Sequence, residues 1–124
     1  MILHEYLPPE VINRDYHLPK AYFRVHELGL LNLDIWRFIQ DKDEFHALST
    51  TIGKDYTSSI LVPFARRVDN DDIACFVVSH RDYSVNEVVI AHLYSGAEFE
   101  ESARQKSFWD WFRLAVNEMI EANA

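Results

Sequence analysis

The histidine and cysteine side chains are the first candidates for chemistry in this sequence. The six histidines are scattered, at His4, His17, His26, His46, His80 and His92. None stands in an HxH, HxxxH or HExxH arrangement, the spacings that bring two imidazoles to one metal ion. The single cysteine, Cys75, lies in the apolar run 73–78, which is typical of a buried and unreactive thiol. The sequence therefore predicts no metal site, no cofactor and no catalytic residue, and a pairing of Cys75 with His92 across neighbouring strands is only a lesser alternative.

Carboxylates are the second candidate group, and they gather in two clusters. The first, Asp69-Asn70-Asp71-Asp72, resembles the start of a calcium-binding loop but lacks the sixth-position glycine and twelfth-position glutamate of such loops. The second, Glu98-Phe99-Glu100-Glu101, precedes a predicted helix, where negative charge is favourable. Each cluster has a plain structural explanation, the first as a solvated turn and the second as a charged helix start. Each is also a dense negative surface for a protein partner.

The net charge of the chain is distributed unevenly. Over 124 residues the sequence has 20 acidic and 12 basic side chains, which leaves a formal charge of −8. From Asp69 onward there are 11 acids and 4 bases, so that −7 of the charge lies in this C-terminal part. Such a field repels nucleic acid and anionic membranes and accelerates association with a basic protein. The alternative is that the charge serves solubility alone.

Length and composition predict one folded domain over residues 1–124. With 48% hydrophobic and 14% aromatic residues the chain can bury one core, and a single cysteine excludes an internal disulfide. The first ten residues lack the features of a signal peptide. No apolar run approaches the roughly 20 residues that span a bilayer. We expect a cytoplasmic protein.

Two helices are predicted at the ends of the fold. The first covers residues 19–29, because Pro19 suits a helix start and Gly29 suits the left-handed residue after a helix end. Its apolar face is expected to comprise Tyr22, Val25 and Leu28. The second begins after Ser107, with Asp110 three residues later as in a capping box. Its apolar arc consists of Phe108, Trp111, Phe112, Ala115, Val116 and Met119.

The middle of the chain predicts an antiparallel sheet. Strands are expected over 58–64, 73–79 and 87–94, and the turns between them are too short for crossover helices, so the strands should form a meander. Pro63 favours a sheet edge or a strand end for the first of these. Within residues 30–40, Leu31, Leu33 and Ile35 alternate with polar residues like a half-buried strand, and the apolar residues that follow, Trp36, Phe38 and Ile39, either extend it or begin a helical turn. A short helix with Phe45 and Leu48 as anchors is expected within 41–56. The fold class is therefore α+β, an antiparallel β-meander packed by an N-terminal helix and a C-terminal amphipathic helix.

The order of several short motifs resembles the SUKH superfamily, whose members include a fungal cell-wall assembly regulator and bacterial immunity-type domains. The motifs are Leu18-Pro19-Lys20-Ala21-Tyr22, Leu61-Val62-Pro63-Phe64-Ala65-Arg66, Asp71-Asp72-Ile73-Ala74-Cys75-Phe76, Val88-Val89-Ile90-Ala91-His92, Gly96-Ala97-Glu98 and Ser107-Phe108-Trp109-Asp110-Trp111. The resemblance implies an antiparallel sheet flanked by helices that serves as a protein-binding scaffold. Many bacterial members neutralise toxins, often nucleases, which implies a bacterial immunity protein here.

The functional prediction is a non-catalytic, acidic domain that binds a cognate toxin with a basic surface, and not nucleic acid or membrane. The predicted partner-binding residues are Asp69, Asp71, Asp72, Glu98, Glu100 and Glu101, with Tyr83 and Tyr94 as aromatic anchors. One alternative is a regulatory adaptor of the same fold with an endogenous protein partner. Another is a small-ligand binder or enzyme with a pocket near Cys75 and His92. The oligomeric state is not predicted.

Overall fold

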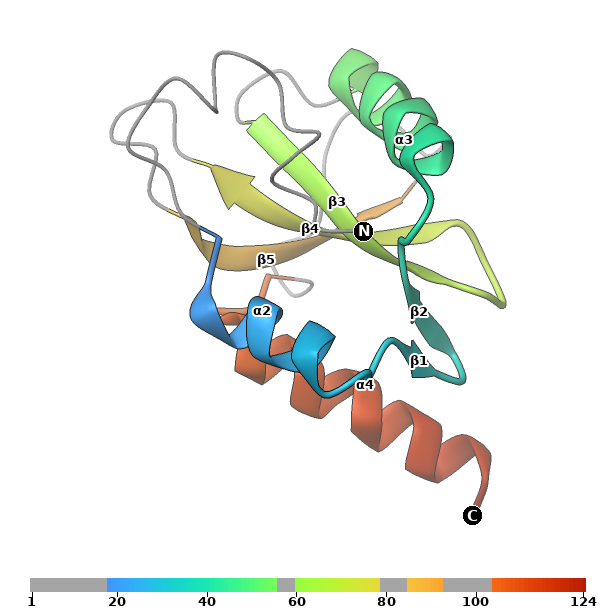
Figure 1. Ribbon diagram of the computed structural model, residues 1–124. Helices are drawn as coiled ribbons and strands as arrows, with labels where there is room; N and C mark the ends of the chain where they lie inside the picture. The colour runs from blue at the N-terminus through green and yellow to red at the C-terminus, as the bar shows by residue number, and fades with distance from the viewer. Residues whose placement is uncertain (1–17, 56–59, 79–84, 93–103) are drawn as a thin grey trace.

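The computed structural model describes residues 18–55, 60–78, 85–92 and 104–124. The helices of this described part are α2 (Lys20–Glu27), α3 (Lys42–Asp55) and α4 (Phe108–Ala122), and its strands are β1 (Asn32–Leu33), β2 (Trp36–Phe38), β3 (Ile60–Arg67), β4 (Asp72–Val78) and β5 (Val85–His92). The strands form one antiparallel sheet in the order β1-β2-β3-β4-β5. The predicted α+β meander is thus confirmed. Helices α2 and α4 lie against one face of the sheet and α3 against the other (Figure 1).

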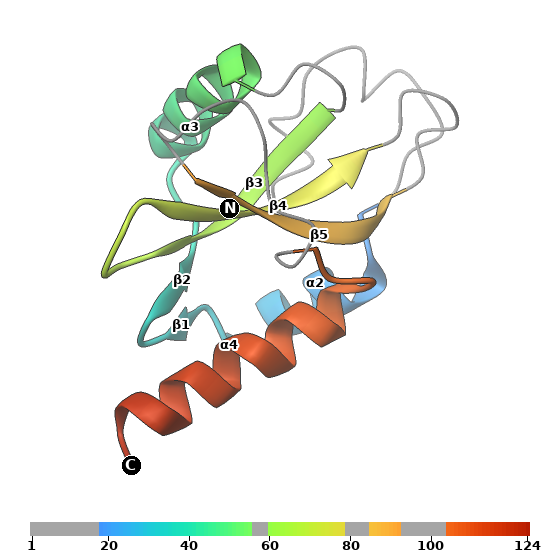
Figure 2. The ribbon, with the colours of Figure 1, turned by 180° about the vertical axis from the view of Figure 1, so that it is seen from behind.

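An aromatic core fills the space between the sheet and helices α2 and α4. The rings of Phe64 and Phe76 stack with their centroids 4.2 Å apart, and Trp111 meets Phe64 edge-on at 4.9 Å. Tyr22 from α2 and Phe108 from α4 complete the cluster. Burial of each such side chain contributes about 1.5–3 kcal/mol to the free energy of folding. The two helices therefore dock because each brings buried apolar side chains to the same sheet surface. The view from behind shows both helices on one side of the sheet (Figure 2).

The two terminal helices begin where their sequences predict, and α2 ends shortly before Gly29. Pro19 is the residue before α2, and Gly29 follows its end with φ of +69°, a conformation that glycine adopts without steric cost. The Ser107 hydroxyl accepts a hydrogen bond from the Asp110 amide at 3.2 Å, which caps α4. One expectation for α2 is wrong: Leu28 is 51% exposed, because the helix ends at Glu27 and Leu28 is its C-terminal capping residue.

Pro63 lies inside the sheet and not on an outer strand, which corrects one prediction. Strand β3 is flanked by β2 and β4, but β2 pairs only with its second half, from Ala65 to Arg67. Pro63 precedes that half, at a register shift between Pro63 and Ala65, so its missing N–H interrupts no pairing with β2. The extra residue at the shift is Phe64, whose ring joins the aromatic cluster under α2 and α4.

Residues 30–40 form a hairpin of two short strands where the alternation predicted one strand. The turn is made by Asp34, which has a φ of +67°, and the Asn32 side chain accepts a hydrogen bond from the Asp34 amide at 3.0 Å. The helix expected after it is confirmed and is 14 residues long. Its anchors are Phe45 and Leu48, as predicted, together with the buried Ile52.

The two edges of the sheet differ in length and in what pairs with them. Strand β1 has only two residues. At the opposite side, Gln105 forms an isolated bridge with Val88 in the middle of β5, with N–O distances of 2.7 and 3.0 Å. Arg104 beside it pairs with Glu87 of β5.

In the part of the chain that the structure describes, no helix combines the length and apolar character that crossing a membrane requires.

Candidate functional site

The first acidic cluster lies in the turn that joins β3 to β4, hereafter the acidic turn (residues 68–71, with Asp72 as the first residue of β4). Its backbone is ordered by Asn70, whose side-chain oxygen accepts a hydrogen bond from the Asp72 amide at 2.8 Å. Asp69 and Asp71 are both exposed. The segment is a short polar turn, as predicted. It presents carboxylates on a backbone that the Asn70 hydrogen bond holds in place.

Two of the three carboxylates of this cluster are held by basic side chains of the sheet. Arg67 donates to both carboxylate oxygens of Asp69, at 2.6 and 3.2 Å. This hydrogen bonding lowers the pKa of the Asp69 carboxyl. His92 of β5 contacts Asp72 through Nδ1 at 2.5 Å. Asp71 has no hydrogen-bond or ion-pair partner among the described residues, and its side chain is exposed.

Arg67 links the acidic turn to the C-terminal helix. Its guanidinium also pairs with Glu118 of α4 and lies over the ring of Trp36, 5.9 Å from the ring centroid. The Trp36 indole N–H in turn donates to the other Glu118 oxygen at 3.4 Å. The hydrogen bond to Asp69 is the main cause of a raised pKa of the guanidinium, which therefore stays charged. Glu118 is 51 residues from Arg67 in sequence, and no local pattern indicated this contact.

Five of the predicted partner-binding residues lie outside the described residues. They are Tyr83, Tyr94, Glu98, Glu100 and Glu101. The described part of the site is therefore the acidic turn with Asp69, Asp71 and Asp72.

The alternative pairing of Cys75 with His92 is wrong. Cys75 is opposite Val89 in the sheet, whereas His92 is opposite Asp72, three positions away along β4. Because side chains alternate between the two faces of a strand, Cys75 and His92 point to opposite faces. Cys75 is fully buried, as predicted, and burial raises the pKa of its thiol. Within residues 18–55, 60–78, 85–92 and 104–124 there is no cluster of three or more His, Cys, Asp or Glu side chains that could hold a metal ion.

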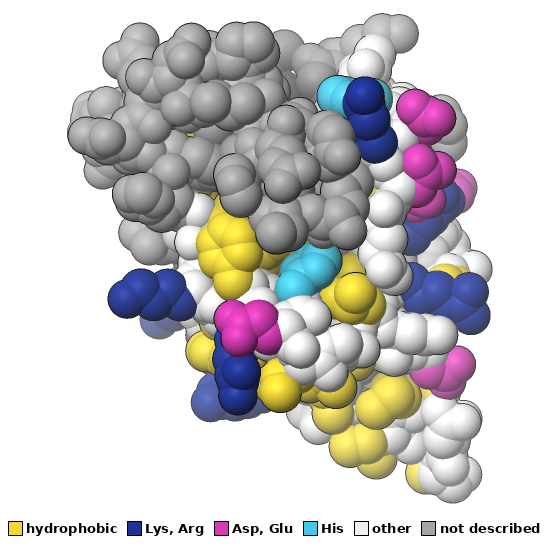
Figure 3. All heavy atoms as spheres, viewed as in Figure 1, with side chains coloured by type: hydrophobic (Ala, Val, Ile, Leu, Met, Phe, Trp, Pro, Cys, Tyr) yellow, Lys and Arg dark blue, Asp and Glu magenta, His cyan; other side chains and the backbone are white. Residues whose placement is uncertain are grey.

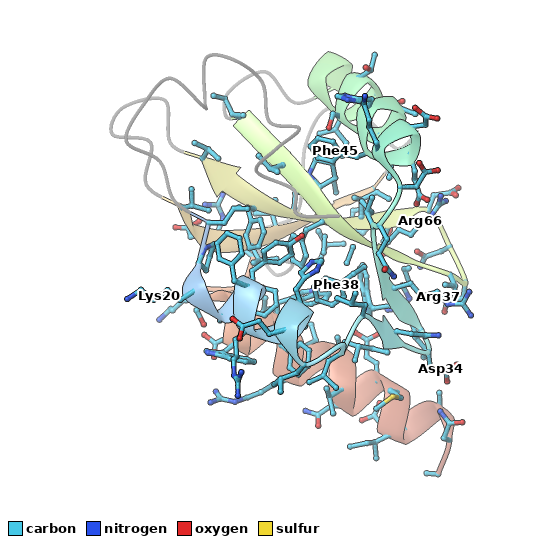
Figure 4. All side chains as sticks on the ribbon, viewed as in Figure 1. Lys20, Asp34, Arg37, Phe38, Phe45 and Arg66 are labelled. Carbon is cyan, nitrogen blue, oxygen red and sulfur yellow. The ribbon has the colours of Figure 1, made fainter. Side chains whose placement is uncertain are left out.

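Sequence reasoning missed a surface pocket of about 460 Å³ beside the acidic turn. It lies between the β1–β2 hairpin, the end of β3 and the start of α3, and two of its lining residues are Arg37 and Arg66. Figure 4 labels both arginines, which project from the sheet on the side of α3. Val68, the residue before Asp69, also lines the pocket, so that it adjoins the acidic turn. The two arginines are far apart in sequence, and only the pairing of β2 with β3 brings them together.

Comparisons with protein-family models, with curated proteins and with solved structures each gave no match to this chain. The resemblance to the SUKH superfamily, with the immunity function that it implies, therefore stays a prediction from the sequence motifs.

Proposed function

We propose that this chain is a non-catalytic protein-binding domain that recognises a basic partner through the acidic turn, and that it acts as an immunity protein for a toxin such as a basic nuclease. The observation that carries the proposal is the arrangement of the turn itself. Arg67 holds Asp69 at one end and His92 contacts Asp72 at the other, while Asp71 between them is exposed. A carboxylate presented on a backbone that is already ordered loses little conformational freedom when it binds.

Charge supports the same proposal. The chain carries a formal charge of −8, which raises the rate of encounter with a basic protein and opposes binding to nucleic acid. A toxin that cleaves nucleic acid needs a basic groove, and an acidic inhibitor can occupy that groove in place of phosphates. The β3–β4 hairpin that carries the acidic turn projects from one side of the sheet (Figure 1), where a partner can reach it.

The test uses the full chain and the partner captured with it from its native cell. The association rate of the purified pair is measured by stopped-flow fluorescence at low and high salt for the wild type, for Asp71→Asn and for Glu121→Gln. Glu121 is an exposed acid near the end of α4, so this variant removes the same charge away from the turn. We expect Asp71→Asn to slow association and flatten its salt dependence more than Glu121→Gln does, because close charges dominate steering.

Two results would count against the proposal. If both variants change the association rate equally, the acidic turn is not at the interface. If the captured partner is itself acidic, or is unaffected in its toxic activity by this chain, the immunity function is wrong.

A further inference from the structure

The pocket beside the acidic turn has two arginines on one wall. Arg37 of β2 and Arg66 of β3 are direct partners in the antiparallel pairing of the two strands, so their side chains leave the same face of the sheet as neighbours. Like charges placed directly opposite each other destabilise a sheet. Figure 3 shows basic and acidic side chains together along the side of the molecule that α3 and the sheet form.

Only one of the two arginines is neutralised within the described chain. Arg66 pairs with Glu44 of α3 at 3.5 Å. Arg37 is exposed and has neither a hydrogen-bond nor an ion-pair partner among the described residues. The second pocket carboxylate, Asp41, is also engaged, because its Oδ1 accepts a hydrogen bond from the Asp43 amide at 3.0 Å as α3 begins. The charged lining residues are two arginines and two carboxylates, and among them Arg37 is the one with no hydrogen-bond or ion-pair partner in the described part of the chain.

The other lining residues determine which chemical groups of a ligand the pocket can contact. The amide side chains of Asn32 and Gln40 line the pocket and offer N–H donors, and Asn32 is the direct strand partner of Arg37. Leu31 and Val68 supply apolar surface, and Val68 is 49% exposed. A guanidinium next to N–H donors binds a carboxylate in a planar, two-point contact. The neighbouring apolar surface is covered from water only if the ligand also has an apolar body.

We infer that this pocket binds a carboxylate carried on an apolar body, with the carboxylate on Arg37 and the body against Leu31 and Val68. A monoanion fits better than a phosphate, because Asp41 and Glu44 line the same pocket and would repel a second negative charge. Such a carboxylate belongs either to a free organic acid or to the end of a polypeptide chain that has an apolar last residue. The inference is independent of the acidic turn and of the proposed immunity function.

The test is an amide-proton NMR titration of the full chain with four defined probes. Phenylacetate represents a free organic acid and acetyl-leucine a polypeptide end, while acetyl-leucinamide lacks the carboxylate and inorganic phosphate lacks the apolar body. We expect saturable chemical-shift changes of the amide protons of pocket residues with phenylacetate or acetyl-leucine. The probe with the lower dissociation constant shows whether the natural carboxylate belongs to a free organic acid or to a polypeptide end. Acetyl-leucinamide should bind at least about tenfold more weakly than acetyl-leucine, since it loses a charged hydrogen-bond pair.

Two variants assign the binding to Arg37. Arg37→Gln should weaken carboxylate binding by about tenfold or more, because it removes the charge of a charge-assisted hydrogen bond. Arg24→Gln is the matched control, because Arg24 is an exposed arginine of α2 with its own partner, Glu27, and it is not among the pocket residues. Unchanged thermal melting of both variants shows that they fold. The inference is overturned if neither carboxylate gives saturable shifts, if phosphate binds more tightly than both, or if Arg37→Gln binds as well as the wild type.

Discussion

Arg67 in β3 and Glu118 in α4 form an ion pair that joins the C-terminal helix to the sheet, with the Trp36 indole against both partners. The two charged side chains are 24% and 20% exposed, so that water screens the pair only in part. The same guanidinium holds Asp69. One arginine therefore contacts both α4 and the acidic turn, in addition to the apolar packing of α4 and the Asn70 hydrogen bond of the turn.

A double-mutant cycle tests this dependence. Arg67→Gln should lower the free energy of unfolding by about 1–3 kcal/mol, because it leaves Glu118 and Asp69 without their partner. Glu118→Gln should cost less, since Arg67 keeps Asp69. Urea unfolding of the two single variants and the double variant measures a coupling energy, which we expect to be about 1 kcal/mol for groups in one network. Strict additivity of the two changes would show that the pair contributes nothing to stability.

The pH dependence of stability should contain a contribution from His26. Burial lowers the pKa of its imidazole below 6.5, and the ring packs 4.6 Å from that of Tyr22. Above pH 6.5 the ring is neutral in both states and its contribution to stability is complete. As the pH falls from there to the lower folded-state pKa, the unfolded chain takes up a proton first, so the free energy of unfolding decreases.

The measurement compares three proteins. Urea unfolding between neutral and mildly acidic pH is followed for the wild type, for His26→Gln and for His46→Gln, whose histidine is exposed on α3. We expect the slope of unfolding free energy against pH to be smaller in His26→Gln than in the other two proteins. Equal slopes in all three would show that His26 titrates alike in the folded and unfolded chain.

The thiol of Cys75 should be inert while the protein is folded. It is fully buried, and a thiolate, the reactive form, is disfavoured by the burial that raises its pKa. An aromatic disulfide reagent should therefore label Cys75 in the native protein only when the protein unfolds locally or globally. The labelling rate should be at least about a thousandfold lower than that of the protein in denaturant. Labelling of the native protein at the rate of the unfolded chain would place the thiol at the surface.

Two neighbouring tryptophans of α4 provide a matched pair for the core. Trp111 is fully buried against Phe64 and Phe38, whereas Trp109 is 42% exposed. Trp111→Ala should lower the free energy of unfolding by about 3–5 kcal/mol through the cavity that it leaves. Trp109→Ala should cost less than about 2 kcal/mol, because part of its ring is already in water. Denaturant unfolding measures both, and equal losses would contradict the docking of α4.

Local patterns predicted the elements whose causes lie within a few residues. Pro19 and Gly29 mark the limits of α2, and Ser107 caps α4, because each acts on the backbone beside it. The hairpin at Asp34 was not predicted, since alternation of apolar and polar residues continues through the turn. The turn of this hairpin depends on the positive φ of Asp34. Aspartate can adopt this conformation, but its presence in a sequence does not predict it.

The candidate site was predicted only in part, because its geometry depends on contacts distant in sequence. The acidic turn follows from Asp69, Asn70 and Asp71 themselves, and the partner of Asp69 is Arg67, two residues away, but the contacts of Asp72 with His92 and of Arg67 with Glu118 join residues distant in sequence. His92 reaches Asp72 only through the register of β4 with β5. The Arg37 pocket likewise requires β3 to pair with β2, although the whole of α3 lies between them in sequence.

The bridge between Val88 and Gln105 has a consequence for how other proteins can approach this domain. A chain that adds itself to a sheet as another strand needs a row of free backbone N–H and C=O groups. Here one border of the sheet is a strand of two residues, and the middle of the other border is already bonded to Gln105. Growth of the sheet by a foreign strand is therefore disfavoured at β1 and at the middle of β5.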